Sequence, residues 1–561
     1  MSINPLSFSK ALLISGMIVF ISFGCSKTDE TEMLVLGGTI LTLDPSQPEV
    51  EAMVVRDGKV EAVGIKAELE TRFPKAQRHD LEGRTVLPGF IDSHTHVYAL
   101  AHDMKKVDLA GTLTIKEMTE KLRAHHPDPP EGQWLIGANW DEGEWGSRGY
   151  PDRAELDEAF PNNPVYLESL HGFAGFYNGR ALEIAGIGPE TPDPEVGEIL
   201  RRPNGEPTGT LLTRAQDLVN KHIPPESLEE TKETLLLGMN LMAKEGVTSI
   251  HEAGMGKEMV QAFSELREEG RLPIRVYGML SRRNKDLMEE WFKRGPWIDP
   301  EAFFTVRSIK VFYDGSLGSR TAILKEPYSD EPEGANMTEY ISSQELTSLS
   351  SQALEKGFQM VIHAIGDGAN DRVLSIFEKV LKSDPSVDHR WRIEHAQVVL
   401  PDFYMRCAAQ HIISSMQSSH AVEDRYWAED RVGPERIRHA YAWRRMLDAG
   451  VFLLMNSDLP AVPWKPLYTL YFAVTRKDLN GNPPEGWYPD QILTVEETLY
   501  AMTLAGAYAA FQEDQLGSLS PGKFADFVEL DKDPRHAKPE ELKNIKVLRT
   551  WVAGKVVSEI N

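Results

Sequence analysis

Two histidines one residue apart, His94 and His96, have the residue type and spacing to bind a metal ion. They follow an apolar run at 85–88 and end the segment 89–96. Because side chains i and i+2 of a strand lie on the same face, both imidazoles can point into one space. A pair of this kind also occurs as ordinary surface or packed histidines, so the hypothesis depends on further ligands elsewhere in the chain.

Four such candidates lie in or at the ends of other apolar segments: Lys310, His363, His395 and Asp458. Imidazole and carboxylate groups bind zinc, manganese, iron and cobalt. A lysine in an apolar segment is costly to bury unless it is paired. We therefore expect Lys310 either to have a function or to pair with Asp314, which follows it closely.

Eight short segments have the composition of buried parallel strands. They are 89–96, 247–251, 274–280, 308–312, 359–363, 390–395, 412–416 and 451–458. Most intervals between them have room for a helix, and 344–356 and 369–382 carry apolar residues at helical spacing. This order predicts an α/β fold, a (β/α)8 TIM barrel, in which catalytic groups lie at the carboxyl ends of the strands.

Both ends of the chain predict a second, smaller β domain. Strand-like segments occur at 33–40, 52–63, 526–530 and 547–552. We expect residues 32–87 and 511–561 to form a β-sandwich around a barrel at 88–510. An interval at about 101–244 is too long for a simple connection, so it is expected to form an inserted α/β subdomain over the active-site mouth.

Together these motifs resemble the amidohydrolase superfamily, in the branch similar to N-substituted formamide deformylases. The resemblance runs from about residue 33 to the C-terminus and is most specific at 89–96, 309–320, 363–367 and 521–527. It implies two divalent ions, zinc being the metal expected. One ion is expected on His94 and His96. The second is expected on His363 and His395, with carboxylated Lys310 as the bridge.

The reaction implied by the resemblance is hydrolysis of a carbon–nitrogen bond outside peptides, in a small amide or N-substituted formamide, by a metal-activated hydroxide. Asp458 would bind an ion and carry the proton to the leaving nitrogen. From its position alone, Asp458 could instead cap the loop that follows. A cyclic-amide hydrolase or deaminase on the same scaffold stays open, as does a non-catalytic lipoprotein that binds a small molecule.

Three residues are candidates for substrate contact: His171, His420 and Trp140. His171 resembles a family histidine that faces the substrate, although its neighbours differ, and structural packing is the alternative. His420 resembles the histidine of a Gln-Pro-x-His stretch but has Ser418 in place of the proline. Trp140 and Trp145 could line an apolar pocket or pack as a local core.

Two positions close to the ligands also bear on the site. Asn456 stands where glycine is commoner in the family, which could reshape the floor of the pocket. His251 and Glu252 close the second strand, where a hydrogen bond to a ligand is expected rather than direct ligation.

Composition excludes some classes of function. The formal net charge of −25 argues against binding nucleic acid or anionic lipid through a general basic field. At 561 residues and 41% hydrophobic, the chain can bury a large core but is too polar for a multi-span membrane protein. The sequence carries no indication of an oligomeric state.

The N-terminus predicts export. An apolar run at 11–24 follows Lys10 and precedes Cys25. The run is shorter than the ~20 residues of a spanning helix, and a cysteine in this place is typical of a bacterial lipoprotein signal at 1–25. We expect an enzyme facing the periplasm or cell surface, attached to the membrane only through a lipid anchor. Cys407 is then left without a partner and is expected to be packed.

Overall fold

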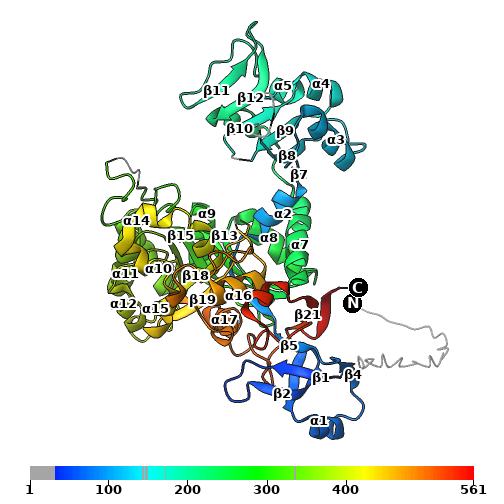
Figure 1. Cartoon of the computed structure of the whole chain (residues 1–561), viewed down its shortest axis with the longest axis vertical. Helices are drawn as coiled ribbons and strands as arrows, with labels where there is room; N and C mark the ends of the chain where they lie inside the picture. The colour runs from blue at the N-terminus through cyan, green and yellow to red at the C-terminus, as the bar shows by residue number, and fades with distance from the viewer. Residues whose placement is uncertain are drawn as a thin grey trace, which may run out of the picture.

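The computed structural model describes residues 32–560 except 142–144, 146–148, 171, 334–336 and 461. Figure 1 shows three parts: a β domain, a central barrel, and an insert joined to the barrel through α2 (Val97–Lys105) and α7 (Leu228–Lys244). Among the described residues, no helix is both long and apolar enough to cross a membrane. The predicted lipoprotein signal lies outside the described residues.

Eight parallel strands form the barrel in the order of the sequence. They are β6 (Phe90–Thr95), β13 (Val247–Met255), β14 (Arg275–Ser281), β15 (Phe304–Phe312), β16 (Gln359–Ala364), β17 (Arg392–His395), β18 (Ile413–Gln417) and β19 (Phe452–Asn456). The helices that follow them include α8 (Lys257–Glu268), α9 (Lys285–Arg294), α10 (Ser343–Lys356), α11 (Asp367–Leu381), α12 (Phe403–Ala409), α13 (Ser418–Asp424), α14 (Ala428–Arg436), α15 (Trp443–Asp448), α16 (Pro466–Thr475), α17 (Val495–Ala501) and α18 (Leu504–Ala509). The predicted (β/α)8 barrel is confirmed.

Helix α10 illustrates how the sequence sets the limits of an element. Ser342 accepts a hydrogen bond from the backbone N–H of Glu345, and the Glu345 carboxylate accepts from that of Ser342, each at 3.2 Å. This capping box satisfies two backbone donors at the start of the helix. Gly357 ends the helix with φ of +77°, a left-handed conformation that glycine adopts without strain. The helix predicted at 344–356 is confirmed.

The barrel closes between its first and last strands. The backbone N–H of Asp458 donates to the carbonyl of His94 at 3.1 Å. Beside this bond, the buried Asp92 accepts from the backbone N–H of Ser457 at 3.1 Å and from its hydroxyl at 2.6 Å. Closure of the barrel therefore places Asp458 next to His94, and these two residues belong to the candidate site.

Both chain ends contribute to the β domain. β5 (Thr85–Pro88) pairs antiparallel with β20 (Phe527–Leu530), which joins the two ends. The other strands are β1 (Met33–Leu41), β2 (Glu49–Arg56), β3 (Lys59–Gly64), β4 (Gln77–Asp80), β21 (Val547–Val552) and β22 (Lys555–Glu559). They form one hydrogen-bonded sheet that branches at β1, which pairs with β2, β4 and β5. A β domain built from both ends is confirmed, with its strands in one branched network.

The insert is an α/β unit with its own core. Its strands lie in the order β11-β12-β10-β9-β8-β7. Their bounds are β7 (Val107–Asp108), β8 (Leu135–Trp140), β9 (Val165–Ser169), β10 (Ala174–Tyr177), β11 (Gly197–Arg201) and β12 (Pro207–Thr213), and the helices are α3 (Ile115–His125), α4 (Ala154–Ala159), α5 (Gly179–Ala185) and α6 (Asp217–Asn220). In Figure 1 this unit stands away from the barrel.

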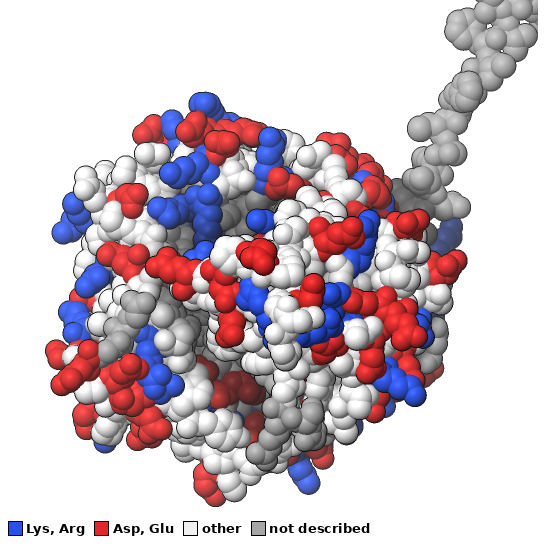
Figure 2. Space-filling model, turned by 90° about the horizontal axis from the view of Figure 1, so that it is seen from above, with Lys and Arg blue, Asp and Glu red and all other residues white. Residues whose placement is uncertain are grey.

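Figure 2 shows the molecule from above the insert, with acidic and basic side chains interspersed over the described part of this face. Such mixing gives no single basic field on the face in view. Like the net charge of −25, this mixed surface provides no general electrostatic attraction for nucleic acid on the face in view.

A buried ion pair fastens the β domain to the barrel. Arg275 donates from Nε and Nη2 to the two carboxylate oxygens of Asp526, at 2.6 and 3.0 Å. Its guanidinium lies 4.2 Å from the ring centroid of Phe524 and 4.5 Å from that of Phe303. Asp526 also accepts from the backbone N–H of Ala553 at 2.8 Å. Because both charged groups are buried, each depends on the other.

Asp526→Asn tests this connection. The substitution preserves size but removes the charge opposite buried Arg275, so we expect the free energy of unfolding to fall by about 3–5 kcal/mol. Urea denaturation of the purified variant measures the change. Glu559→Gln, which breaks the more exposed pair with Arg549, is the control and should cost less than about 1 kcal/mol. Equally small losses in both variants would contradict the fastening role.

Candidate metal centre

A cavity of about 350 Å³ lies at the carboxyl end of the barrel. The residues that line it are His94, His96, Lys310, Phe312, Ser316, Leu317, Gly318, His363, Ile365, His395, Gln397, His420, Asp424, Trp427, Asp458 and Val462. All six predicted metal ligands are among them, although they come from strands far apart in the sequence. His420, predicted to contact substrate, lies in the same wall.

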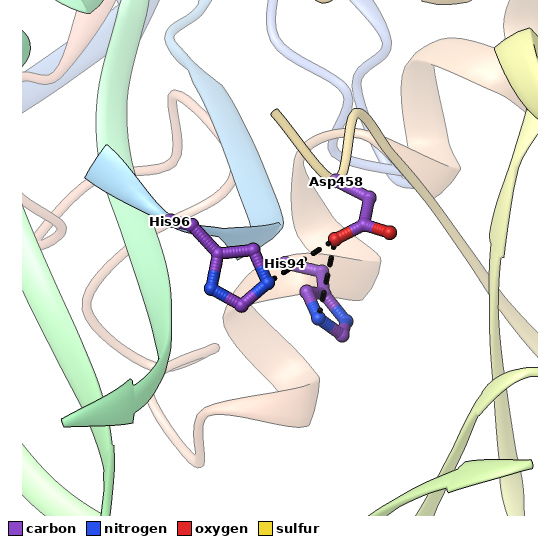
Figure 3. A group of neighbouring side chains, drawn as sticks. All are labelled: His94, His96 and Asp458. Carbon is purple, nitrogen blue, oxygen red and sulfur yellow. Dashed lines mark ion pairs between the residues drawn. The ribbon is translucent and has the colours of Figure 1, made fainter. Parts of the chain in front are cut away.

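Asp458 is shared by two groups of candidate ligands. Figure 3 shows His94 and His96 on one side of it, with Asp458 Oδ1 3.5 Å from His94 Nε2 and 3.4 Å from His96 Nε2. In each of the groups His94, His96, Asp458 and His395, His420, Asp458, one ligand atom per residue lies within 4.8 Å of the others. Three protein ligands are typical of a catalytic metal site. His420 is therefore also close enough to bind an ion.

His94 presents Nε2 to the cavity because its other ring nitrogen is engaged. Nδ1 donates to the carboxylate of Glu394 in a short hydrogen bond. Glu394 in turn accepts from Arg392 Nε at 2.8 Å, and both side chains are fully buried. Lys310 Nζ lies 2.9 Å from His94 Nε2, whose lone pair accepts the hydrogen bond. A metal ion would use that same lone pair.

His395 and His363 are oriented in the same manner. The side-chain oxygen of Gln417 accepts from His395 Nδ1 at 2.8 Å, and the carbonyl of Gly315 accepts from His363 Nε2 at 3.1 Å. Gln417 donates from Nε2 to Asn456 at 2.7 Å, so Asn456 helps to hold His395. Ligating histidines in metalloproteins almost always donate their second ring nitrogen in this way. The three buried histidines therefore fit the requirements of metal ligands.

Burial favours the neutral form of these imidazoles. Burial and then the charge of Lys310 lower the pKa of His94 to about 4 and that of His363 to about 3. Burial also holds the pKa of His395 well below its usual range. Neutral imidazole is the form that binds a metal. Asp314 is no partner for Lys310 here, because its carboxylate accepts from three backbone N–H groups.

Asp458 is ionised and held in place. Burial alone would raise its pKa, but the surrounding imidazoles of His94, His96 and His395 keep the pKa well below the usual range. Its φ of +55° is left-handed, as is the +72° of His395. Such backbone conformations cost about 1–3 kcal/mol and cluster at functional sites. The hydrogen bond that closes the barrel holds Asp458 against that strain.

Trp140, one of the residues predicted to contact substrate, is not among those that line the cavity. Trp140 is fully buried in the insert, where Nε1 donates to the carbonyl of Leu167 at 2.9 Å and the ring lies 5.8 Å from that of Trp145. This is the packing of a local core, the alternative considered from the sequence. His171 lies outside the described residues. The insert, expected to cover the mouth, contributes none of the described lining residues.

The sequence did not predict three residues that orient the candidate ligands: Arg392, Glu394 and Gln417. Arg392 and Glu394 are two residues apart on one strand, so their side chains lie on the same face. Two opposite charges at that spacing in an apolar segment indicate a buried ion-pair network. His251 was expected to form a hydrogen bond with a candidate metal ligand. Its Nδ1 instead accepts a hydrogen bond from Arg392 at 3.0 Å, and Arg392 in turn holds Glu394. Cys407 is buried, as predicted.

The chain matches known proteins over most of its length. A model of the amidohydrolase family matches residues 77–558. The chain is 32% identical over 542 residues to Protein LONG AFTER FAR-RED 3 of Arabidopsis thaliana, covering 93% of this chain and 91% of that protein. It is 30% identical over 543 residues to N-substituted formamide deformylase of Arthrobacter pascens, covering 94% and 98%.

Solved structures agree with the sequence comparison. The fold is similar to that of an uncharacterized metal-dependent hydrolase from Pyrococcus horikoshii OT3, with a TM-score of 0.76 and 27% identity over 91% of this chain and 99% of that one. That protein is a metal-dependent hydrolase, and the amidohydrolase family model indicates hydrolysis of carbon–nitrogen bonds; the histidines and Asp458 supply a fitting metal site. This chain belongs to the amidohydrolase family.

Proposed function

We propose that this metal-dependent hydrolase cleaves a carbon–nitrogen bond in a small non-peptide amide, specifically an N-substituted formamide. The likeness to N-substituted formamide deformylase over 94% of the chain supports the formamide. The observation that carries the proposal is the orientation of His94, His363 and His395, each with one ring nitrogen engaged by a protein acceptor. That arrangement serves metal binding and has no other use in the mechanism.

The donor set has room for two divalent ions, and zinc suits the imidazole and carboxylate ligands. One ion is assigned to His94, His96 and Asp458. The second is assigned to His363 and His395. When bound, such ions supply an activated water for attack and polarise the scissile carbonyl.

Lys310 is assigned the bridge between the two ions, as a carbamate. Burial lowers the pKa of Lys310 to about 8, so part of it is neutral amine near neutral pH, the form that adds to carbon dioxide with loss of a proton. The reaction replaces a positive charge with a negative one beside His94, whose Nε2 lies 2.9 Å from Nζ. An anion at this place favours cation binding by the surrounding imidazoles.

Asp458 is assigned the proton transfer. It is ionised and can therefore accept a proton from the attacking water and later deliver it to the leaving nitrogen. Its Oδ1 faces His94 and His96, while Oδ2 lies 3.7 Å from His420 Nε2 and 3.9 Å from His395 Nδ1. The carboxylate thus lies among four of the imidazoles that line the cavity.

Export is a separate part of the proposal. The apolar run at 11–24 before Cys25 supports a lipoprotein signal, with the enzyme held at the periplasmic or outer face of a bacterial membrane by lipid on Cys25. The site would then receive its metal outside the cytoplasm.

The substrate class is tested by product analysis. With zinc or manganese supplied, we expect N-hexylformamide to give formate and hexylamine, whereas a cyclic amide and adenosine should not react. Asp458→Asn should lower kcat by about 10²–10⁴-fold because it removes the proton carrier, and exposed Asp430→Asn is the matched control. Ammonia from adenosine without formate release would replace the proposal with deamination.

Metal binding separates the roles of Lys310 and Glu394. By elemental analysis we expect about two ions per chain, falling to about one in Lys310→Ala because the bridge is lost. Glu394→Gln should keep both sites but bind metal about 10–100-fold more weakly, since His94 loses its charged acceptor. Exposed Glu355→Gln is the control in a competition with a coloured chelator. Unchanged metal content and affinity in both variants would refute these assignments.

Lipidation is tested by labelling cells with a fatty acid. The expected result is label on the full chain in the membrane fraction and none on Cys25→Ala, because the acceptor thiol is removed. Cys407→Ala, which alters the buried cysteine, is the control and should keep the label. Equal labelling of the Cys25→Ala variant would contradict the anchor.

A further inference from the structure

The cavity holds a second carboxylate that the proposed mechanism does not use. Asp424 is the last residue of α13, the helix that follows the seventh barrel strand. His420 and Asp424 are four residues apart and so share one face of this helix. Both line the cavity, and His420 Nε2 lies 3.7 Å from Asp458 Oδ2.

Neutral donors from two other elements fix the orientation of Asp424. Its Oδ2 accepts from Gln397 Nε2 at 2.8 Å and from the hydroxyl of Tyr441 at 2.7 Å. Gln397 also donates to the Tyr441 oxygen at 2.5 Å, which ties the two donors together. Both donor side chains are buried. Within the described residues, no hydrogen bond ends on Asp424 Oδ1, so that oxygen is left for a ligand.

No cation of the described residues forms an ion pair with Asp424. The neighbouring Arg425 pairs with Asp478 at 2.5 Å, and Lys310 is engaged with His94. Burial raises the pKa of Asp424, as expected for a carboxylate that has only neutral hydrogen-bond partners. A half-buried carboxylate in this state gains most from a ligand that brings its own positive charge.

The surface next to Asp424 suits a protonated amine. Trp427 lines the same cavity three residues further along the chain, and an indole attracts cations, as the guanidinium of Arg431 5.6 Å from its ring centroid shows. Phe312, Leu317 and Ile365 supply apolar wall for a hydrocarbon linker. The cavity of about 350 Å³ suits a compact molecule.

We infer that Asp424 is a specificity-determining residue that binds a protonated amine of the substrate, away from the scissile bond. The substrate is then the amide or formamide of a diamine, with one nitrogen acylated and the other charged. This inference rests on the proposed function for its reaction, but the recognition of a cation rests on Asp424, Gln397 and Tyr441 alone.

A matched pair of substrates tests the inference. N-(5-aminopentyl)formamide and N-hexylformamide have chains of equal length and differ in a terminal ammonium or methyl group. In the wild-type protein, kcat/KM should favour the ammonium compound by about tenfold or more, the range of a charged hydrogen bond. Asp424→Asn should abolish that preference through KM, while N-hexylformamide keeps its kcat/KM within about twofold.

Two further variants separate recognition from folding. Tyr441→Phe removes one donor to Asp424 and should reduce the preference partly, whereas exposed Asp430→Asn should preserve it. Equal kcat/KM for both formamides in the wild type, unchanged in Asp424→Asn, would overturn the inference and leave the proposed function standing.

A binding measurement tests the inference in the case that neither formamide is hydrolysed. Calorimetry on the metal-loaded protein compares hexylamine with hexan-1-ol, which differ only in the protonated amine. Tighter binding of the amine by about tenfold, lost in Asp424→Asn, would support the inference even if neither formamide were hydrolysed. Equal affinities in both proteins would overturn it.

Discussion

The site depends on the ion pair between Arg392 and Glu394. Both side chains are fully buried, and neither charge is stable there alone, because an unpaired buried ion costs several kcal/mol. Strand alternation points both into the barrel. Glu394 accepts from His94 of the first strand, and Arg392 donates to the carbonyl of Ser93 at 2.6 Å. A charge pair of the sixth strand thus fixes the position and tautomer of a ligand of the first.

Closure of the barrel adds the second constraint. The first and eighth strands meet where the backbone of Asp458 donates to that of His94, and Asp92 holds Ser457 in the same turn. A left-handed φ at Asp458 persists because these bonds fix the segment from both sides. The hydrogen bonds that close the barrel therefore also place the Asp458 carboxylate among the imidazoles.

The sequence predicted the barrel and the residues that meet in its cavity because strand ends are encoded locally. Apolar segments and i, i+2 spacing identify where histidines point, and parallel strands bring their carboxyl ends together. The orientation of a side chain depends instead on partners distant in sequence. Glu394 holds His94 across 300 residues, and Gln417 depends on Asn456. Trp140 had an ambiguous local pattern, and only the packing of the insert places it in a separate core.

Two carboxylates in one cavity can have different roles because their neighbours differ. Asp458 lies among imidazoles that favour its charge, so it suits a group that exchanges protons with the reacting atoms. Asp424 accepts from neutral donors on one oxygen and forms no ion pair with a cation of the described residues, so it suits a group that holds a charged ligand still. A substrate that meets both must carry its reactive carbonyl at one end and its charge at the other.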